Sequence, residues 1–356
     1  MYGVETETFE RIALTRLPEL QVASGLFRAT ARIEGVEDEG GAPTTLRAGV
    51  VVLLGLLRAD QAELAQPFST GALRTKVLGD LGGEEATPGD IGLAMWAESR
   101  ADGGAVSEIQ ALLKRRVVKN FDKVPLEELS WIVSGLTEAS VRFGEEAGLS
   151  DTLEEATHAL VGRADERTGL LEDVPRKRRG HLTPVSSQFH ALRALCQVVR
   201  AGDSGIADGP ARALAEALIE LQRDDGAWPG LVDPQRGEAV AIYPVLTVTQ
   251  VALAPTALRV ADQQIPDPEF EPAITRGLAW ANGDNVLRFD LVHEQEARLD
   301  RGILPRKEPG AVQRGLSTAA RRLRGGLQEP DPAGLILDPA VSSEDLGWVL
   351  EAWAGR

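Results

Sequence analysis

The architecture is indicated first by the stretch LRAGVVVLLGLL (residues 46–57), in which Arg47 is the only charged side chain. A helix that is apolar on nearly every side must be surrounded by protein. Five further stretches of low charge follow it: DIGLAMWA (90–97), LEELSWIVSGLTEA (126–139), VSSQFHALRALCQVV (185–199), YPVLTVTQVALAPTAL (243–258) and EDLGWVLEAWA (344–354). We therefore expect six buried helices that form an inner ring.

Amphipathic segments alternate with these stretches, at about residues 5–20, 67–80, 105–118, 150–163, 210–222 and 269–282. Pro67, Ser150, Pro210 and Pro268 lie where a first helical turn or a cap belongs. The alternation predicts one all-α domain over residues 1–356, an (α/α)6 toroid of six helical hairpins. A long irregular insertion, residues 283–341, precedes the last inner helix, and its basic segment 313–326 is a candidate for one further surface helix.

The connections from outer to inner helices are the long ones, notably residues 163–184, 223–242 and 283–341. In a toroid of this kind they all lie at one end, above the first turns of the inner helices. Functional residues concentrate on such loops. We expect a polar funnel to open at that end.

Composition narrows the function classes. The net charge of −16 disfavours nucleic acid and anionic membrane surfaces as partners, because both need a basic footprint. No apolar run approaches the ~20 residues that span a bilayer, and no secretory signal is visible, so we expect a cytoplasmic protein. The single cysteine, Cys196, excludes an intrachain disulfide and a cysteine metal cluster. We expect no cofactor and no metal, and the oligomeric state is open.

The segment LQRDDGAWP (residues 221–229) contains Gln222, Gly226 and Trp228 in the spacing Gln-x3-Gly-x-Trp. It resembles the Gln/Trp repeat of squalene-hopene and related terpenoid cyclases, α/α toroids that are similar to protein prenyltransferases and to six-hairpin glycosidases. The resemblance implies a structural role, in which the motif ties a helix end to the next turn. The acid motif Asp-x-Asp-Asp of those cyclases does not occur here.

Several of the inner stretches also resemble uncharacterised bacterial toroid proteins of polysaccharide loci. In that pattern the fifth inner helix carries a His before its Gln. Here Thr249 precedes Gln250, so a role for such a His is not carried over.

The loop that enters the fifth inner helix holds Asp224, Asp225 and Trp228. Paired carboxylates beside an indole suit a sugar site, since a carboxylate can act as general acid or base while the ring stacks on a pyranose. The alternative is a turn that ends a helix, because Asp-Asp-Gly is an ordinary stop signal that a Trp can cover.

Asp173 and His181 lie in the loop before the fourth inner helix, on either side of four consecutive cations at residues 176–179. A His near carboxylates can shuttle a proton at neutral pH. The cations fit a solvated surface, or an anionic ligand if the loop covers the ring.

Four polar residues belong to otherwise apolar inner helices or to their starts: Gln188, His190, Tyr243 and Gln250. Such side chains either face a central funnel, where they would bind substrate, or bond one another in the core.

The favoured hypothesis is a carbohydrate-active enzyme, a hydrolase, lyase or epimerase that acts on a glycan, with an anionic glycan among the candidates. Asp225 would exchange the proton, with Asp224, His181 and Asp173 as further catalytic candidates. Trp228, Tyr243, Gln250, Gln188 and His190 would bind the small-molecule or glycan substrate. Two alternatives stay open: a terpenoid-cyclase-like enzyme with a nonstandard acid, and a non-catalytic toroid that binds a peptide, glycan or partner protein.

Overall fold

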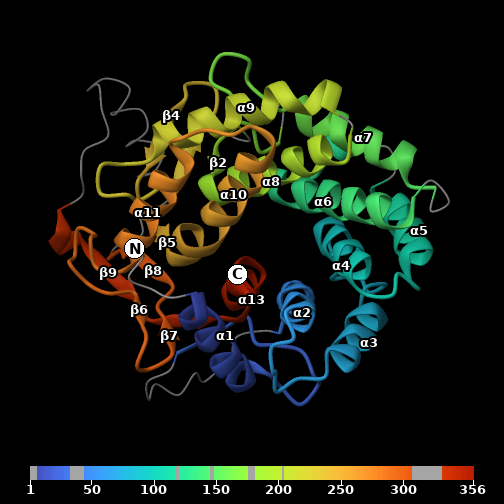
Figure 1. Cartoon of the computed structure of the whole chain (residues 1–356), viewed down its shortest axis with the longest axis horizontal. Helices are drawn as coiled ribbons and strands as arrows, with labels where there is room; N and C mark the ends of the chain where they lie inside the picture. Colours follow the sequence, from blue (N-terminus) through green and yellow to red (C-terminus); the bar gives the residue numbers. More distant parts are fainter. Residues whose placement is uncertain are drawn as a thin grey trace.

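Six helices surround the centre of the ring in the computed structural model, which describes residues 6–32, 44–117, 120–144, 148–174, 181–202, 204–306 and 331–356 (Figure 1). Each packs against the next in chain order, and the last packs against the first, which closes the ring. They are α2 (Leu46–Gln61), α4 (Pro88–Arg100), α6 (Leu126–Phe143), α8 (Val185–Arg200), α10 (Ala254–Gln264) with its preceding π-helical turn η3 (Thr249–Leu253), and α13 (Ser343–Trp353). The predicted (α/α)6 toroid is confirmed.

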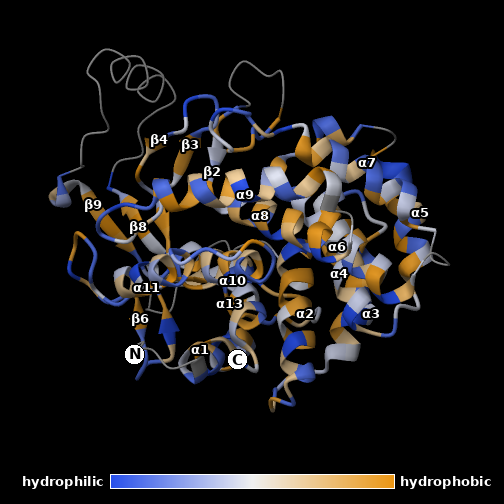
Figure 2. Ribbon diagram, turned by 45° about the horizontal axis from the view of Figure 1, so that its top comes forward, coloured by the Kyte–Doolittle hydropathy of each residue, from blue (hydrophilic) through white to orange (hydrophobic). Residues whose placement is uncertain are grey.

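Among the described residues, six amphipathic helices form the outer layer. They are α1 (Thr6–Leu20), α3 (Thr70–Asp80), α5 (Val106–Val117), α7 (Ser150–Val161), α9 (Ser204–Leu221) and α11 (Phe270–Ala281). Hydrophilic residues colour the outward side of α5 and α7 (Figure 2), as expected for helices with one face in water.

One predicted helix start is wrong. Pro210 lies inside α9 and not in its first turn. The apolar face of α9 continues before the proline, since Ala207 and Ala211 are both fully buried. Packing of this face holds the helix together on both sides of a residue that lacks the backbone N–H.

Glycines allow two pairs of inner helices to approach closely. A Cβ on Gly135 of α6 would lie 2.2 Å from the carbonyl oxygen of Gly92 on α4. A Cβ on Gly55 of α2 would likewise lie 2.6 Å from the carbonyl oxygen of Gly347 on α13. Only hydrogen fits at these crossings, so the backbones of α4 and α6, and of α2 and α13, are in direct contact.

Short antiparallel strands occupy the connections that lead into inner helices. One sheet has the order β2 (Thr183–Pro184), β3 (Leu231–Asp233), β4 (Glu238–Ala241), and a second has the order β5 (Val245–Leu246), β8 (Gly302–Pro305), β9 (Leu335–Asp338). Two-stranded pairs are β6 (Val292–His293) with β7 (Arg298–Leu299), and β1 (Thr30–Arg32) with β10 (Ala340–Ser342). Short 3-10 turns are η1 (Phe121–Lys123) and η4 (Pro332–Gly334).

The expectation of an irregular insertion over residues 283–341 is therefore wrong for its described part, which contains β6 to β9. Alternation of apolar and polar residues over so few positions is too weak a signal to predict strands this short. The predicted surface helix at 313–326 lies outside the described residues. Among the helices described, none is long and apolar enough to cross a membrane.

Candidate functional site

Charged residues gather where the inner helices begin. We call Arg47, Asp90, Glu127, Glu128, His190 and Glu344 the N-terminal cluster; all but His190 lie in the first turns of α2, α4, α6 and α13, and His190 lies in the second turn of α8. The ring brings these residues together from positions that are almost 300 apart in the sequence.

Arg47 links three helix starts. Its Nε donates to Asp90 Oδ1 at 3.1 Å, and its Nη2 donates to Glu128 Oε1 at 3.1 Å. Its guanidinium also lies 4.9 Å from the ring centroid of Trp131, within cation–π range. Burial opposes the cation, but the charges on Asp90 and Glu344 outweigh it and hold the pKa of Arg47 above its ordinary value. Arg47 thus holds the first turns of α2, α4 and α6 together.

Glu127 is the group of the cluster with useful proton chemistry, and it lies beside His190. Glu127 Oε1 lies 3.8 Å from His190 Nε2, too far for a direct hydrogen bond, and the Glu127 side chain is 34% exposed. Although that side chain reaches solvent, the surrounding protein buries the carboxyl group enough to raise its pKa to about 7, with the charge of Glu344 acting in the same direction. Burial, assisted by the charge of Arg193, lowers the pKa of His190 to about 3, so its imidazole is neutral at pH 7.

Aromatic rings form a layer beneath this pair. Trp131 meets His190 edge to face at 5.4 Å between centroids, and Trp348 lies 4.8 Å from His190 and 6.2 Å from Trp131. Both indoles are buried. The layer holds the imidazole in one orientation and keeps the polar groups above it out of the core.

The start of α13 adds two carboxyl groups. Burial raises the pKa of Glu344 and raises that of Asp345 to about 7. The backbone N–H of Asp345 donates to Ser342 Oγ at 3.2 Å, which caps the helix. At neutral pH this end of the ring therefore contains carboxyl groups that are partly protonated.

The predicted loop residues Asp224 and Asp225 have the contacts of a turn. Asp225 Oδ1 accepts from the backbone N–H of Ala227 at 3.1 Å and lies 3.2 Å from Arg223 Nε. Asp224 is exposed. Gln222 donates to the carbonyl oxygens of Gly226 and Ala273, both at 2.8 Å, and so joins the end of α9 to α11. The structural role implied by the Gln/Trp resemblance is observed.

Trp228 is a core residue. Its side chain has no exposed area, its indole N–H donates to the carbonyl oxygen of Leu218 at 2.8 Å, and its ring packs against Phe189 at 5.1 Å. This correction to the predicted sugar contact has a simple cause, since an indole enclosed on every side has no face left for a pyranose.

Asp173 and His181 do not meet as a proton-shuttling pair in the described contacts. Asp173 Oδ1 accepts from the backbone N–H of Leu126 at 2.9 Å and so caps α6 beside Glu127. His181 Nε2 lies 3.8 Å from Asp233 Oδ2 on β3. The four neighbouring cations at residues 176–179 lie outside the described residues.

The polar residues of the inner helices divide between core and cluster. Gln188 is fully buried and bonds both backbone groups of Leu171, at 3.0 and 2.6 Å. Gln250 is also fully buried and accepts from the backbone N–H of Trp228 at 3.3 Å. Tyr243 is buried and precedes a cis peptide bond to Pro244. Of the nine predicted site residues, only His190 belongs to the N-terminal cluster.

Sequence reasoning missed Arg47, Glu127 and Glu344. The signal was present, because each is a charged residue at the start of a stretch that is otherwise mainly apolar. Acidic residues are common at helix starts in any case, so their position alone does not mark these carboxylates as functional.

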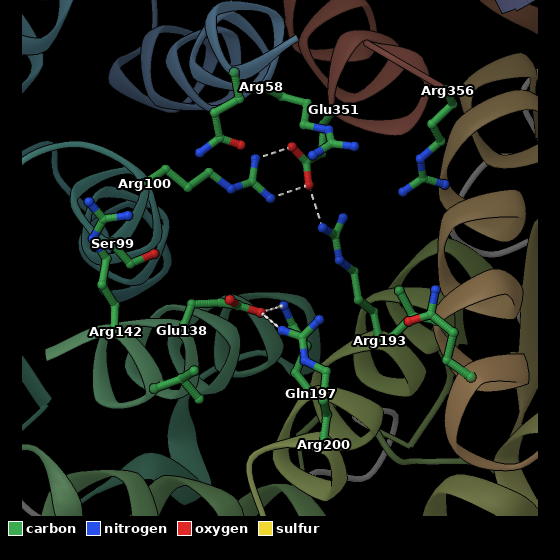
Figure 3. A pocket seen from close by; sticks show the side chains of 14 residues that line it. Arg58, Ser99, Arg100, Glu138, Arg142, Arg193, Gln197, Arg200, Glu351 and Arg356 are labelled. Carbon is green, nitrogen blue, oxygen red and sulfur yellow. Dashed lines mark hydrogen bonds and ion pairs between the residues drawn. The ribbon is translucent and has the colours of Figure 1, made fainter. Parts of the chain in front are cut away.

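A cavity of about 380 Å³ lies at the other end of the ring, between the last turns of the inner helices (Figure 3). This is opposite to the end where the loop lengths predicted a funnel. We call it the C-terminal pocket.

Solved structures with the same fold include several sugar enzymes. A cellobiose 2-epimerase from Bacillus thermoamylovorans has a TM-score of 0.67 at 9% identity, over 97% of this chain and 98% of that chain. A sugar epimerase from a ruminal bacterium has a TM-score of 0.60 at 12% identity, over 91% and 100%. A family 76 glycoside hydrolase (mannosidase) from Bacteroides thetaiotaomicron has a TM-score of 0.60 at 10% identity, over 98% and 97%. No family model matches this chain, and neither does any curated protein. The fold is that of the α/α toroid enzymes.

Proposed function

We propose that this protein is a carbohydrate-active enzyme that moves a proton to or from a sugar at the N-terminal cluster. The observation that carries the proposal is Glu127, a partly exposed carboxyl group whose pKa is raised to about 7, beside the neutral imidazole of His190. The sugar specificity named for the three structures of the same fold supports a glycan as substrate.

The chemistry follows from the protonation states. A general acid or base works best with a pKa near the working pH, because both of its forms are then populated. Glu127 would take a proton from the sugar carbon next to a carbonyl or carboxylate group, and the protonated Glu127 would return that proton to one face or the other of the planar intermediate. The neutral imidazole of His190 would form a hydrogen bond with a substrate oxygen. Return of the proton to the other face is epimerisation, whereas loss of a leaving group from the neighbouring carbon is elimination.

Hydrolysis fits the cluster less well. A glycosidase pairs a protonated carboxyl group with one that stays ionised. Here the pKa values of Glu127 and Glu344 are both raised, so their environment does not favour one protonated and one ionised carboxyl group. The terpenoid-cyclase alternative has no support in the structure, because the nearby indoles of Trp131 and Trp348 are buried in the core.

The reaction class is tested by following reducing disaccharides and uronate-containing oligosaccharides by proton NMR in D₂O with the whole protein. Epimerisation places deuterium on the sugar carbon next to the carbonyl and yields a second stereoisomer. Elimination yields an alkene signal, and hydrolysis yields new reducing ends without carbon-bound deuterium. Deuterium incorporation or an alkene product supports proton abstraction, whereas hydrolysis alone rejects it.

Glu127→Gln keeps the shape of the side chain and removes its proton transfer. We expect turnover to fall by about 100-fold to 10,000-fold, since that is the usual loss when a general acid or base is removed. Asp225→Asn is the matched control, also a carboxylate-to-amide change, and should leave turnover unchanged. The proposal is wrong if Glu127→Gln retains full activity, or if the two variants lose activity equally while both stay folded.

A further inference from the structure

The C-terminal pocket concentrates positive charge in a protein whose net charge is −16. Its lining includes the arginines 58, 100, 142, 193, 200 and 356, against two carboxylates, Glu138 and Glu351. Figure 3 shows these side chains converging from α2, α4, α6, α8, α13 and the short segment that follows α13.

The floor of the pocket is a buried ion triad with an excess cation. Glu351 is 2% exposed and pairs with both Arg100, at 2.7 Å from its Nη2, and Arg193. Burial works against the ionised carboxylate, but the two guanidinium groups override it and lower the pKa of Glu351 to about 2. One carboxylate therefore serves two arginines, and Glu138 is already bonded to Arg200 and to Gln197.

Two arginines at the rim have no carboxylate partner among the described residues. Arg58 and Arg142 line the cavity, and neither forms an ion pair in this part of the chain. A third arginine, Arg356, has its pKa lowered to about 10. The main cause is desolvation, and the positive charges of Arg259, Arg193 and Arg58 act in the same direction. An anion would offset the repulsion that these cations exert on Arg356, and the pocket is large enough to admit one.

Buried polar atoms of the lining point to the rest of the ligand. Arg193 Nε and Gln197 Oε1 are both buried without a hydrogen-bond partner. The amide of Gln197 is oriented by its 2.7 Å bond from Nε2 to Glu138, so its oxygen is the free acceptor. A buried acceptor without a donor costs free energy, and a hydroxyl group would satisfy it.

Helix ends alone do not explain the cluster. Arginines in the last turn of a helix are favoured by its dipole, which accounts for Arg58, Arg142 and Arg200 as surface charges. The dipole effect is confined to the last turn. Arg193 lies seven residues before the end of α8 at Arg200, and its guanidinium stacks on Trp96 at 4.3 Å. The helix dipole therefore does not explain Arg193, which is a buried part of the pocket floor.

We infer that the C-terminal pocket binds a hydroxylated organic phosphate, of which a sugar phosphate is the simplest example. A phosphate group carries nearly two negative charges and several acceptor oxygens, which suits the rim arginines, and the sugar hydroxyls would donate to Gln197. This site is separate from the N-terminal cluster and does not depend on the proposed reaction there.

The probe for this proposal is glucose 6-phosphate, measured by isothermal titration calorimetry and by its effect on Tm, which rises when a ligand binds the folded state. We expect saturable binding to the wild type. Arg58→Ala and Arg142→Ala should each weaken it about 10-fold, because each removes a charge-assisted hydrogen bond. Arg115→Ala, at an exposed position in the last turn of α5, makes the same charge change elsewhere and should leave binding unchanged.

Two outcomes overturn the proposal. One is a wild type that shows no binding of glucose 6-phosphate, which leaves Arg58, Arg142 and Arg200 as helix-end charges. The other is an Arg58→Ala, Arg142→Ala double variant that binds as tightly as the wild type, because the ligand then binds elsewhere, for example at the N-terminal cluster. Pyrophosphate is the comparison without hydroxyl groups, and equal affinity for it overturns the assignment of the sugar to Gln197.

Discussion

The two ends of the inner ring are chemical opposites. The N-terminal cluster is rich in carboxyl groups and contains one linking cation, Arg47, whereas the C-terminal pocket is rich in arginine and contains two carboxylates. Residues near the C-terminal ends of all six inner helices line the C-terminal pocket, so the helices run in the same direction, with their partly positive N-termini at one end and their partly negative C-termini at the other. Each end carries side chains of the sign that its helix dipoles favour.

The comparison shows that buried carboxyl groups at the two ends have pKa values shifted in opposite directions, because their charged neighbours differ. At the N-terminal cluster, burial and neighbouring acids raise the pKa of Glu127 to about 7. At the C-terminal pocket, two arginines outweigh burial and lower the pKa of Glu351 to about 2. One carboxyl group is adapted to exchange a proton, and the other to stay charged.

The largest effect on stability is expected at the C-terminal pocket. Glu351→Ala leaves Arg100 and Arg193 without their shared partner, and breaking a buried ion pair in this way typically costs about 3–5 kcal/mol. Urea unfolding measures the loss. Glu138→Ala is the control, because its partner Arg200 is 41% exposed and exposed pairs contribute only about 0–1 kcal/mol. Equal losses of unfolding free energy in the two variants would mean that the buried triad contributes no more to stability than the exposed pair.

The aromatic layer between the two ends depends on close packing of α4 and α6. Gly135→Ala places a Cβ against the carbonyl oxygen of Gly92, and overpacking of this kind typically costs about 1–3 kcal/mol. Gly79→Ala on α3, where an added Cβ meets nothing within 4 Å, should instead be neutral or stabilising. Thermal unfolding of both variants tests the comparison, and a harmless Gly135→Ala would contradict the described crossing.

The pH dependence of stability should differ in sign between the ends. The pKa of Glu127 is higher in the folded than in the unfolded state, so its ionisation opposes folding as pH rises through about 7. Glu127→Gln should therefore raise Tm more at about pH 8 than at about pH 5. The pKa of Glu351 is lowered to about 2, so its stabilisation is complete above its ordinary range and is lost only as pH falls through about 2.

Glu351→Gln should accordingly lower Tm by similar amounts at both of those pH values. If Glu127→Gln changes Tm equally at the two pH values, the raised pKa of Glu127 is not supported.

The smallest effect is expected outside both ends. Asp225→Asn keeps an oxygen that accepts from the backbone N–H of Ala227 and loses only a partly exposed pair with Arg223. Its stability should stay within about 0.5 kcal/mol of the wild type. A larger loss in chemical unfolding would show that this turn contributes more than its contacts indicate.

The ring was predictable from the sequence because low charge along a whole helix has one explanation, enclosure by protein, and six such stretches alternate with amphipathic ones. The site was predictable only in part. Gln188 and His190 are two positions apart on α8, and both are buried, so periodicity could not tell which one faces the centre. Arg47, Glu127 and Glu344 become neighbours only when the ring closes, a long-range arrangement that local patterns do not encode.

Closure of that ring has a consequence for the order in which the chain can fold during synthesis. Helix α13 packs against α2, β10 pairs with β1, and Trp353 stacks on Phe9 at 5.1 Å. The ribosome synthesises one partner of each contact early and the other late, because almost the whole length of the chain separates them. Until α13 emerges, the face of α2 that bears Gly55 has no neighbour, and Arg100 on α4 lacks Glu351. The nascent chain therefore holds an open arc of hairpins with an exposed apolar edge, and such late, long-range contacts are the ones that fold slowly and invite aggregation.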